Sequence, residues 1–207
     1  YPGTGLPAKY DGHFFLCHFK GNIAKSGIRT FTVQPSGAGF SMNDSEQFIW
    51  NIEATDVDFG PDSRLYFSDW GEGWATSGKG RIFTAVETNS IKEPIVAETE
   101  KLIANGFAKT SQKDLLKHLA HPNMKVRLEA QFTLAERGEK SIAALAKLAA
   151  DKSAKPVARR HAIWALGQIG RKNSRALTPL LPLLADTDAE IRAQSAKILG
   201  DDHLTEA

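Results

Sequence analysis

Three variants of one helical pattern occupy the C-terminal part of this 207-residue chain. They are HPNMKVRLEAQFTLAERG (121–138), KSAKPVARRHAIWALGQIG (152–170) and DTDAEIRAQSAKILGD (186–201). Arg127, Arg159 and Arg192 recur at steps of 32 and 33 residues, and a leucine follows each arginine by seven positions. Such a period with helical spacing is typical of an α-solenoid, in which each helix pair buries its apolar face by stacking on the next pair. Solenoids bind partners more often than they catalyse reactions.

The repeat pattern predicts where the helices begin and end. We expect a connecting helix over 95–107, a second helix capped by Ser111 with Asp114 three positions later, and five more. Those five cover about 124–137, 140–150, 155–169, 174–184 and 187–199. The glycines that stand at or after helix ends, where a left-handed residue is needed, are Gly138, Gly170 and Gly200.

Two details of the helices have consequences for stability. Pro182 is expected to kink or displace the 174–184 helix, because proline lacks the backbone N–H that a helix interior requires. Trp164 and Leu166 are predicted to lie on the buried side of the 155–169 helix. Replacing either with alanine is then expected to cost about 2–5 kcal/mol of stability.

Residues 1–86 have the composition of β-structure. Short segments rich in aromatic and β-branched residues alternate with clusters of Gly, Pro, Asn, Asp and Ser, which predicts strands over 13–19, 28–34, 56–60, 64–70 and 81–87. GPDSR at 60–64 predicts a tight turn, and Val57 and Phe59 are expected on one face of a strand with Asp56 and Asp58 on the other. A strand, turn and strand followed by a glycine-rich loop and another strand is the rhythm of a β-propeller blade.

Charge and cysteine content exclude several classes of site. Residues 111–207 carry 16 Lys and Arg against 11 Asp and Glu, a surplus of +5, whereas residues 1–110 carry 10 against 13, or −3. This surplus is too mild to require nucleic acid, so nucleic-acid binding is the disfavoured partner. The one cysteine, Cys17, provides no intrachain disulfide, thiolate metal cluster or CxxCH haem site. The sequence has no run of about 20 apolar residues and no signal peptide. It opens on Tyr1, which suggests a piece of a longer protein.

The order of several motifs resembles one protein family. YDGHFFLCHFKGN, ATDVDFGPDSRLYFSDWGEGW, GKGRIF, LLKHLAHPNMKVRLEAQFTLAERG and RRHAIWALGQIGR together resemble the planctomycete-type membrane-bound dehydrogenases. In that family a β-propeller like that of quinoprotein glucose/sorbosone dehydrogenases continues into HEAT repeats and then a CxxCH cytochrome c domain. Most of the propeller and the CxxCH domain are absent from this sequence.

The resemblance implies an α+β chain in two parts, partial β-propeller blades followed by an α-solenoid of HEAT-like repeats. The implied organisation is propeller blades at 1–90, a linker helix at 91–110 and the solenoid at 111–202. For a longer parent it implies oxidation of a sugar or alcohol by pyrroloquinoline quinone (PQQ) with calcium, electron transfer to a cytochrome c module, and a secreted or periplasmic location. For this chain alone we expect a scaffold rather than a catalyst. A non-enzymatic carbohydrate- or protein-binding propeller with a solenoid arm is the alternative.

The acidic and aromatic residues of the last predicted strands form a candidate site. The glycine-rich loop at 71–80 and its borders hold residues that could line a sugar or cofactor pocket: Asp69, Trp70, Glu72, Trp74, Lys79 and Arg81. The two indoles could equally pack inside the protein. Asp56, Asp58 and Asp62 are weak calcium candidates, since hard cations require several oxygen ligands. Their alternative roles are in the turn and on the solvent side of the strand.

The repeated arginines are the most regular charged feature. In HEAT-like repeats this position commonly forms a structural ladder inside the stack, so Arg127, Arg159 and Arg192 are expected to bond neighbouring acids or helix ends. A basic stripe for phosphates or acidic partners is the alternative. We expect a protein partner on the solenoid, or the missing blades against the sheets.

Overall fold

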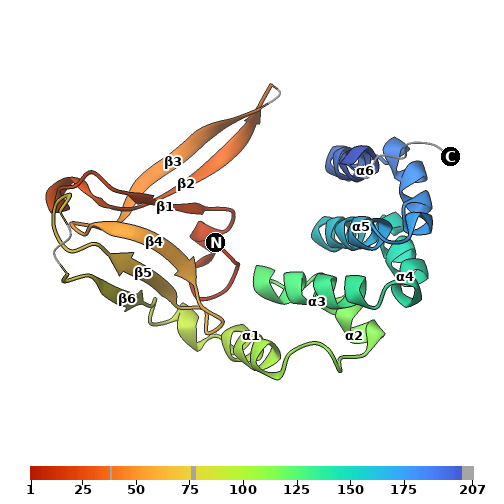
Figure 1. Cartoon of the computed structure of the whole chain (residues 1–207), viewed down its shortest axis with the longest axis horizontal. Helices are drawn as coiled ribbons and strands as arrows, with labels where there is room; N and C mark the ends of the chain where they lie inside the picture. Colours follow the sequence, from red (N-terminus) through yellow and green to blue (C-terminus); the bar gives the residue numbers. More distant parts are fainter. Residues whose placement is uncertain (38, 76–77, 202–207) are drawn as a thin grey trace. The chain divides into compact units, whose positions relative to one another are not determined.

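The computed structural model describes residues 1–37, 39–75 and 78–201 and divides the chain into two compact units, Tyr1–Lys101 and Leu102–Ala207. The first unit is built from antiparallel sheets and the second from helices, so the chain has the α+β fold expected (Figure 1). Residues 76–77 of the predicted ligand loop and residue 202 of the predicted solenoid lie outside the described residues.

Six strands form two three-stranded sheets in the first unit. The first sheet has the order β1-β2-β3 and the second β4-β5-β6, and all neighbouring strands are antiparallel. Each sheet is therefore a meander of consecutive strands. The strands are β1 (Phe14–His18), β2 (Gly27–Ser36), β3 (Gly39–Trp50), β4 (Ala54–Phe59), β5 (Leu65–Asp69) and β6 (Arg81–Ala85).

Among the strands that the described residues form, β3 is the one that the sequence did not predict. Most of its central residues, SMNDSEQ, are polar and have low β-propensity, and the sequence pattern predicts no strand between 34 and 56. Pairing with β2 overrides that local preference, and the pair extends to Ser36 opposite Gly39. Register shifts interrupt the pairing between Ile28 and Arg29 and between Thr30 and Thr32.

The predicted turn at 60–64 is confirmed. The Gly60 N–H donates to the Arg64 carbonyl at 2.8 Å, and the Asp62 carboxylate accepts from the Arg64 N–H at 3.2 Å. Ser63 adopts a positive φ of 62° at the tip. Phe59 is buried and Val57 partly buried, whereas Asp56 and Asp58 are exposed, as the alternation predicted.

The two faces of the first sheet differ in burial. A small apolar core contains Ile28 from this sheet together with Ala54, Phe59, Leu65 and Phe67 from the other. Large apolar side chains remain exposed on β1 and the β2–β3 hairpin, namely Phe14, Leu16, Val33, Phe40 and Met42. Because side chains alternate along a strand and Phe14 pairs with Phe31 and Val33 with Met42, these residues share the face opposite Ile28.

The helices largely follow the predicted boundaries. They are α1 (Pro94–Asn105), α2 (Gln112–His118), α3 (Met124–Glu136), α4 (Glu139–Ala150), α5 (Pro156–Gly170) and α6 (Ala189–Asp201). Ser111 caps α2 by accepting the Asp114 N–H at 3.1 Å, as predicted. The described residues also form five 3₁₀ segments: η1 (Ala8–Tyr10), η2 (Ile23–Lys25), η3 (Ser90–Lys92), η4 (Ser174–Ala176) and η5 (Thr178–Ala185).

The segment predicted as a helix over 174–184 is not an α-helix. It consists of the two 3₁₀ segments η4 and η5, and Pro182 lies inside η5. Proline removes the hydrogen-bond donor that an α-helix would need there, so the disturbance predicted for this segment is observed.

Only one of the three predicted glycine stops has the expected conformation. Gly138 lies between α3 and α4 with φ of 61°. Gly170 is the last residue of α5 and Gly200 lies within α6, and neither has a positive φ. Asp201 still extends α6, so a glycine near the end of a repeat does not by itself end the helix.

The helices pack in two layers. Figure 1 shows α3, α5 and α6 stacked beside one another, with α2 and α4 on one side of the stack, and hydrogen bonds connect α3 to α5 and α5 to α6. Between the layers lies the main apolar core, whose fully buried residues include Leu115, Val126, Leu134, Leu145, Ile163, Leu166, Leu180 and Ile191. Leu166 is therefore buried as predicted, whereas Trp164 is only partly buried. We name the exposed side of α3, α5 and α6 the α3–α5–α6 face.

Candidate interaction face of the helical repeats

The three repeated arginines bind the chain segment that precedes their own helices. Arg127 Nη1 donates to the His121 carbonyl at 2.7 Å, and Arg192 Nη1 donates to the Asp186 carbonyl at 2.8 Å. Arg159 Nε donates to the Ala149 carbonyl at 2.8 Å. Each arginine thus satisfies carbonyls that a helix end or turn would leave without a donor.

Arg159 also forms a buried ion pair. Its guanidinium binds the Asp186 carboxylate through two contacts, of 2.5 and 3.4 Å, and both side chains are at most 4 % exposed. The hydrogen bond from Arg159, followed by the backbone N–H of Asp188, lowers the pKa of Asp186. Asp186 thereby fixes the turn before α6 to the start of α5.

His161 lies in a buried polar cluster between α3 and α5. Arg127 Nε donates to His161 Nε2 at 3.2 Å, so the ring proton is on Nδ1, which donates to Gln131 Oε1 at 2.7 Å. His161 is 2 % exposed. Burial, and then the charges of Arg127 and Arg160, lower its pKa to about 4. The cluster therefore requires a neutral imidazole.

Side-chain amides continue this cluster across the α3–α5–α6 face. Gln131 Nε2 donates to Gln168 Oε1 at 3.2 Å, and Trp164 Nε1 donates to Gln194 Oε1 at 2.8 Å. The Trp164 ring packs edge-on against His161, with 4.9 Å between ring centroids. The sequence pattern marked the arginines but not these glutamines, since amide positions differ from one repeat to the next.

A polar pocket opens on this face. It has a volume of about 300 Å³ and is lined by residues of all three helices, namely Gln131, Trp164, Gly167, Gln168, Arg171, Ile198 and Asp201. A Cβ on Gly167 would lie 2.8 Å from Ile198 Cγ2, so a larger residue there would require the Ile198 side chain to shift. Gly167 of α5 and Ile198 of α6 therefore line the pocket where the two helices approach closely.

The predicted ligand loop of the first unit is brought together only in part. Asp69 is buried and forms an ion pair with Arg81 at 3.0 Å, so these two charges satisfy one another. Glu72, Lys79 and Arg81 line a pocket of about 430 Å³ with Ile23 and Gly71.

The two tryptophans of this loop have separate surroundings. Trp74 is 74 % exposed and stacks edge-on against Phe19, with 5.1 Å between ring centroids. Trp70 is partly buried, and its indole N–H has no acceptor among the described residues. Neither ring lines the pocket that contains Glu72 and Lys79.

The three calcium candidates are not arranged as a shared ligand set. Asp62 is engaged by the Tyr66 hydroxyl at 2.8 Å and by Arg64 Nε at 3.3 Å. Asp56 accepts the N–H of Val57 at 2.8 Å. Within the described ranges, no group of three His, Cys, Asp or Glu side chains could hold a metal ion.

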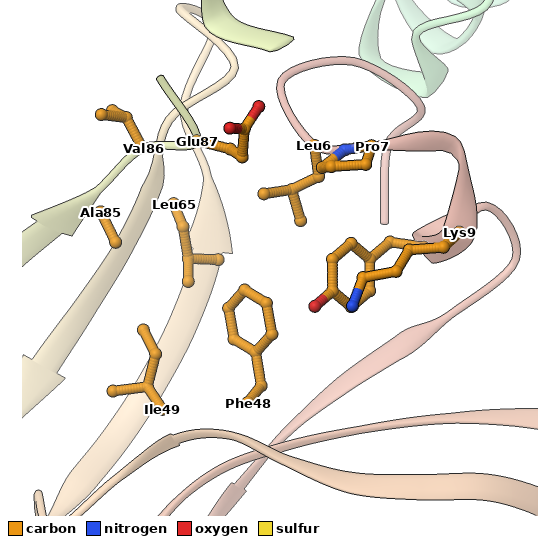
Figure 2. A pocket seen from close by; sticks show the side chains of 10 residues that line it. Leu6, Pro7, Lys9, Phe48, Ile49, Leu65, Ala85, Val86 and Glu87 are labelled. Atoms are coloured by element: carbon orange, nitrogen blue, oxygen red, sulfur yellow. The ribbon is translucent and has the colours of Figure 1, made fainter. Parts of the chain in front are cut away.

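A second pocket in the first unit is mainly apolar. It has a volume of about 380 Å³ (Figure 2). The residues that line it include Leu6, Tyr10, Phe48, Ile49 and Leu65. The Glu87 carboxylate at its edge accepts the backbone N–H groups of Ser90 and Asn89, and these bonds lower its pKa. The sequence did not single out this pocket, because its residues come from four distant segments.

Comparison with known proteins identifies the second unit. Residues 113–200 match the family model described as HEAT repeats. No curated protein and no solved structure matches the chain. The comparisons therefore support HEAT repeats in the helical unit and identify no dehydrogenase or propeller in the sheet unit.

None of the helices formed by residues 1–37, 39–75 and 78–201 is long and apolar enough to cross a membrane.

Proposed function

We propose that this chain is a protein-binding scaffold that holds its partner on the α3–α5–α6 face. The match of residues 113–200 to HEAT repeats carries this proposal, because stacked repeats present continuous surfaces suited to protein partners. The face also has the composition of an interface. It combines the partly buried Trp164, exposed Met124 and Phe132 and a polar pocket.

The partner can be tested by comparing two surface variants of the full chain. Gln168→Glu places a charge in the pocket on the α3–α5–α6 face, whereas Lys147→Glu changes an exposed residue of α4 in the other layer. Proteins that co-purify with the wild type from the source cells are quantified by mass spectrometry. The proposal predicts that a specific partner is lost from the Gln168→Glu sample and retained by Lys147→Glu. Equal retention by both variants contradicts it.

A second candidate function concerns the sheet unit. We propose that the two three-stranded meanders are partial blades of a quinoprotein-dehydrogenase-like propeller in a longer parent, as the motif resemblance implies. The exposed apolar face of the first sheet supports this, since propeller blades bury such faces against neighbouring blades. In that arrangement the parent would be secreted or periplasmic and would oxidise a sugar or alcohol.

The described residues do not fit calcium, because the Asp62 carboxylate is already engaged and no three-ligand group is present in the described part of the chain. Quinone-dependent dye reduction by the native protein, with PQQ and calcium added, tests the parent activity. Sugar-dependent reduction supports a dehydrogenase. Binding of sugars without reduction supports the non-enzymatic carbohydrate-binding alternative.

A further inference from the structure

One stripe of α5 crosses the α3–α5–α6 face. Arg160, Trp164, Gly167 and Arg171 stand at positions i, i+4, i+7 and i+11, which share one side of a helix. Trp164, Gly167 and Arg171 line the 300 Å³ pocket. The stripe therefore has an arginine at each end and an aromatic ring and a pocket between them.

The arginines of this stripe lack acidic partners. Neither Arg160 nor Arg171 forms an ion pair within the described part of the chain. Arg127 lies at the same end as Arg160, and all its hydrogen bonds go to neutral acceptors, two carbonyls and the His161 ring. Burial, and then the charge of Arg160, lower the pKa of Arg127. One end of the stripe thus concentrates positive charge that the solenoid does not neutralise.

Two carboxylates of α6 on this face are already engaged. Asp201 is paired with Lys197 at 2.6 Å, and Glu190 accepts the side-chain N–H of Gln194 at 2.8 Å. These groups leave the arginines available to an external anion. A nucleic acid is a competing ligand, because it carries a negative charge at each phosphate and the same arginines could bind those phosphates.

The pocket between the arginines offers groups that suit a polypeptide backbone. Gln168 Oε1 accepts from Gln131, whereas its side-chain NH₂ has no acceptor within the described residues. An amide NH₂ facing a pocket can donate to a main-chain carbonyl. The partly buried Trp164 ring beside it provides apolar area at a small cost in conformational entropy.

The geometry points to an acidic, extended peptide segment of a partner protein as the ligand of this stripe, with one carboxylate at Arg160 and Arg127 and another at Arg171. The inference rests on the proposed scaffold function and specifies its partner. Eleven residues of helix span about 16 Å at 1.5 Å per residue. An extended peptide covers that length with about five residues, so the two acidic side chains should be about five positions apart.

Fluorescence anisotropy with synthetic peptides tests this inference on the full chain. The probe is a fluorescein-labelled Gly/Ser/Ala peptide with two glutamates five positions apart. One matched peptide has the two glutamates adjacent, and another has glutamines in their place. Arg160→Gln and Arg171→Gln remove one charge each from the stripe. Arg175→Gln removes an exposed charge in η4 as the control, and circular dichroism verifies that every variant keeps its helices.

The inference predicts that the spaced peptide binds more tightly than both matched peptides. Each stripe variant should weaken it by about twofold to fivefold, the range for a partly exposed ion pair, and Arg175→Gln should leave it unchanged. Equal affinity for the spaced and adjacent peptides, or an equal loss in Arg175→Gln, overturns the inference. The inference is also overturned if a single-stranded RNA oligonucleotide binds the wild type more tightly than the spaced peptide does and its affinity falls in Arg160→Gln.

Failure of the inference can be separated from failure of the scaffold proposal. If the three peptides bind with equal affinity but a native partner is still lost from the Gln168→Glu sample, the face binds a protein that lacks the acidic motif. If neither experiment shows a face-specific effect, both proposals are wrong.

Discussion

At the scale of single residues, His161 makes the solenoid sensitive to acid. Its Nε2 accepts from Arg127, so a proton added there would replace the acceptor with a second donor facing a guanidinium. The folded-state pKa of about 4 lies below the unfolded value of 6.5, so the unfolded chain binds the proton first as the pH falls. The contribution of His161 is fully present above about pH 6.5 and is lost as the pH falls towards 4.

We predict that the free energy of unfolding of the helical unit falls by about 2 kcal/mol from this residue between pH 7 and pH 4.5. Urea unfolding followed by circular dichroism at both pH values measures this. In His161→Gln the pH-dependent difference should shrink by the same amount. An unchanged pH dependence in that variant would show that other groups cause the acid sensitivity.

Glu53 is a buried acidic residue that the sequence pattern does not single out. It is fully buried, and neither carboxylate oxygen has a hydrogen-bond partner among the described residues. Burying such a group without a partner is costly. We predict that Glu53→Gln stabilises the first unit by about 1–3 kcal/mol in thermal unfolding. The exposed Glu46→Gln serves as the control and should have little effect. A less stable Glu53→Gln protein would contradict the prediction.

At the scale of elements, the arginine ladder predicts unequal roles for equivalent positions. Arg159→Leu leaves Asp186 buried without its partner and should destabilise the helical unit by about 3–5 kcal/mol. Arg192→Leu occupies the same repeat position but loses bonds to carbonyls at an exposed site, so about 1 kcal/mol is expected. Chemical denaturation of both variants checks this. Equal losses of stability in the two variants would mean that the buried ion pair adds no more stability than the exposed hydrogen bonds of Arg192.

The core of α5 provides another element-scale prediction. Leu166 is fully buried, so Leu166→Ala should cost about 2–5 kcal/mol. The sequence pattern predicts the same loss of stability for Trp164→Ala. However, Trp164 is partly buried and its indole N–H donates to Gln194, so the expected loss of stability is smaller than for Leu166→Ala. Urea unfolding of the two variants gives the comparison. A larger loss in Trp164→Ala would mean that the buried side of α5 is assigned wrongly.

Predictability from sequence also differed between elements. The helices of the solenoid could be placed because Arg127, Arg159 and Arg192 and their leucines repeat with a helical spacing. Strand β3 could not, because its polar residues form a strand only through pairing with β2. Local propensity describes the first case well and fails in the second, where a partner distant in sequence decides the conformation.

The candidate site was also predictable from the sequence only in part. The arginine positions were visible in the repeat, but the Gln131–His161 and Trp164–Gln194 contacts depend on how adjacent helices pack. The ligand loop was predicted from residues that are adjacent in sequence. In the structure Asp69 instead forms an ion pair with Arg81, and Trp74 does not line the pocket that contains Glu72 and Lys79. Side-chain contacts between elements are therefore the information that a single sequence lacks.

At the scale of the whole molecule, the chain combines a sheet unit with an uncovered apolar face and a HEAT-repeat unit with a polar, aromatic face. Both features are typical of chains that act through partners. We propose that a protein partner of this molecule binds the α3–α5–α6 face.

Site-specific photo-crosslinking in the source cells tests that claim most directly. A photoreactive amino acid is placed at Gln168 on the α3–α5–α6 face, and at Lys147 of α4 in a matched protein. We predict a discrete crosslinked protein from the Gln168 position and none from Lys147. The same product from both positions, or a product from Lys147 alone, would contradict the account.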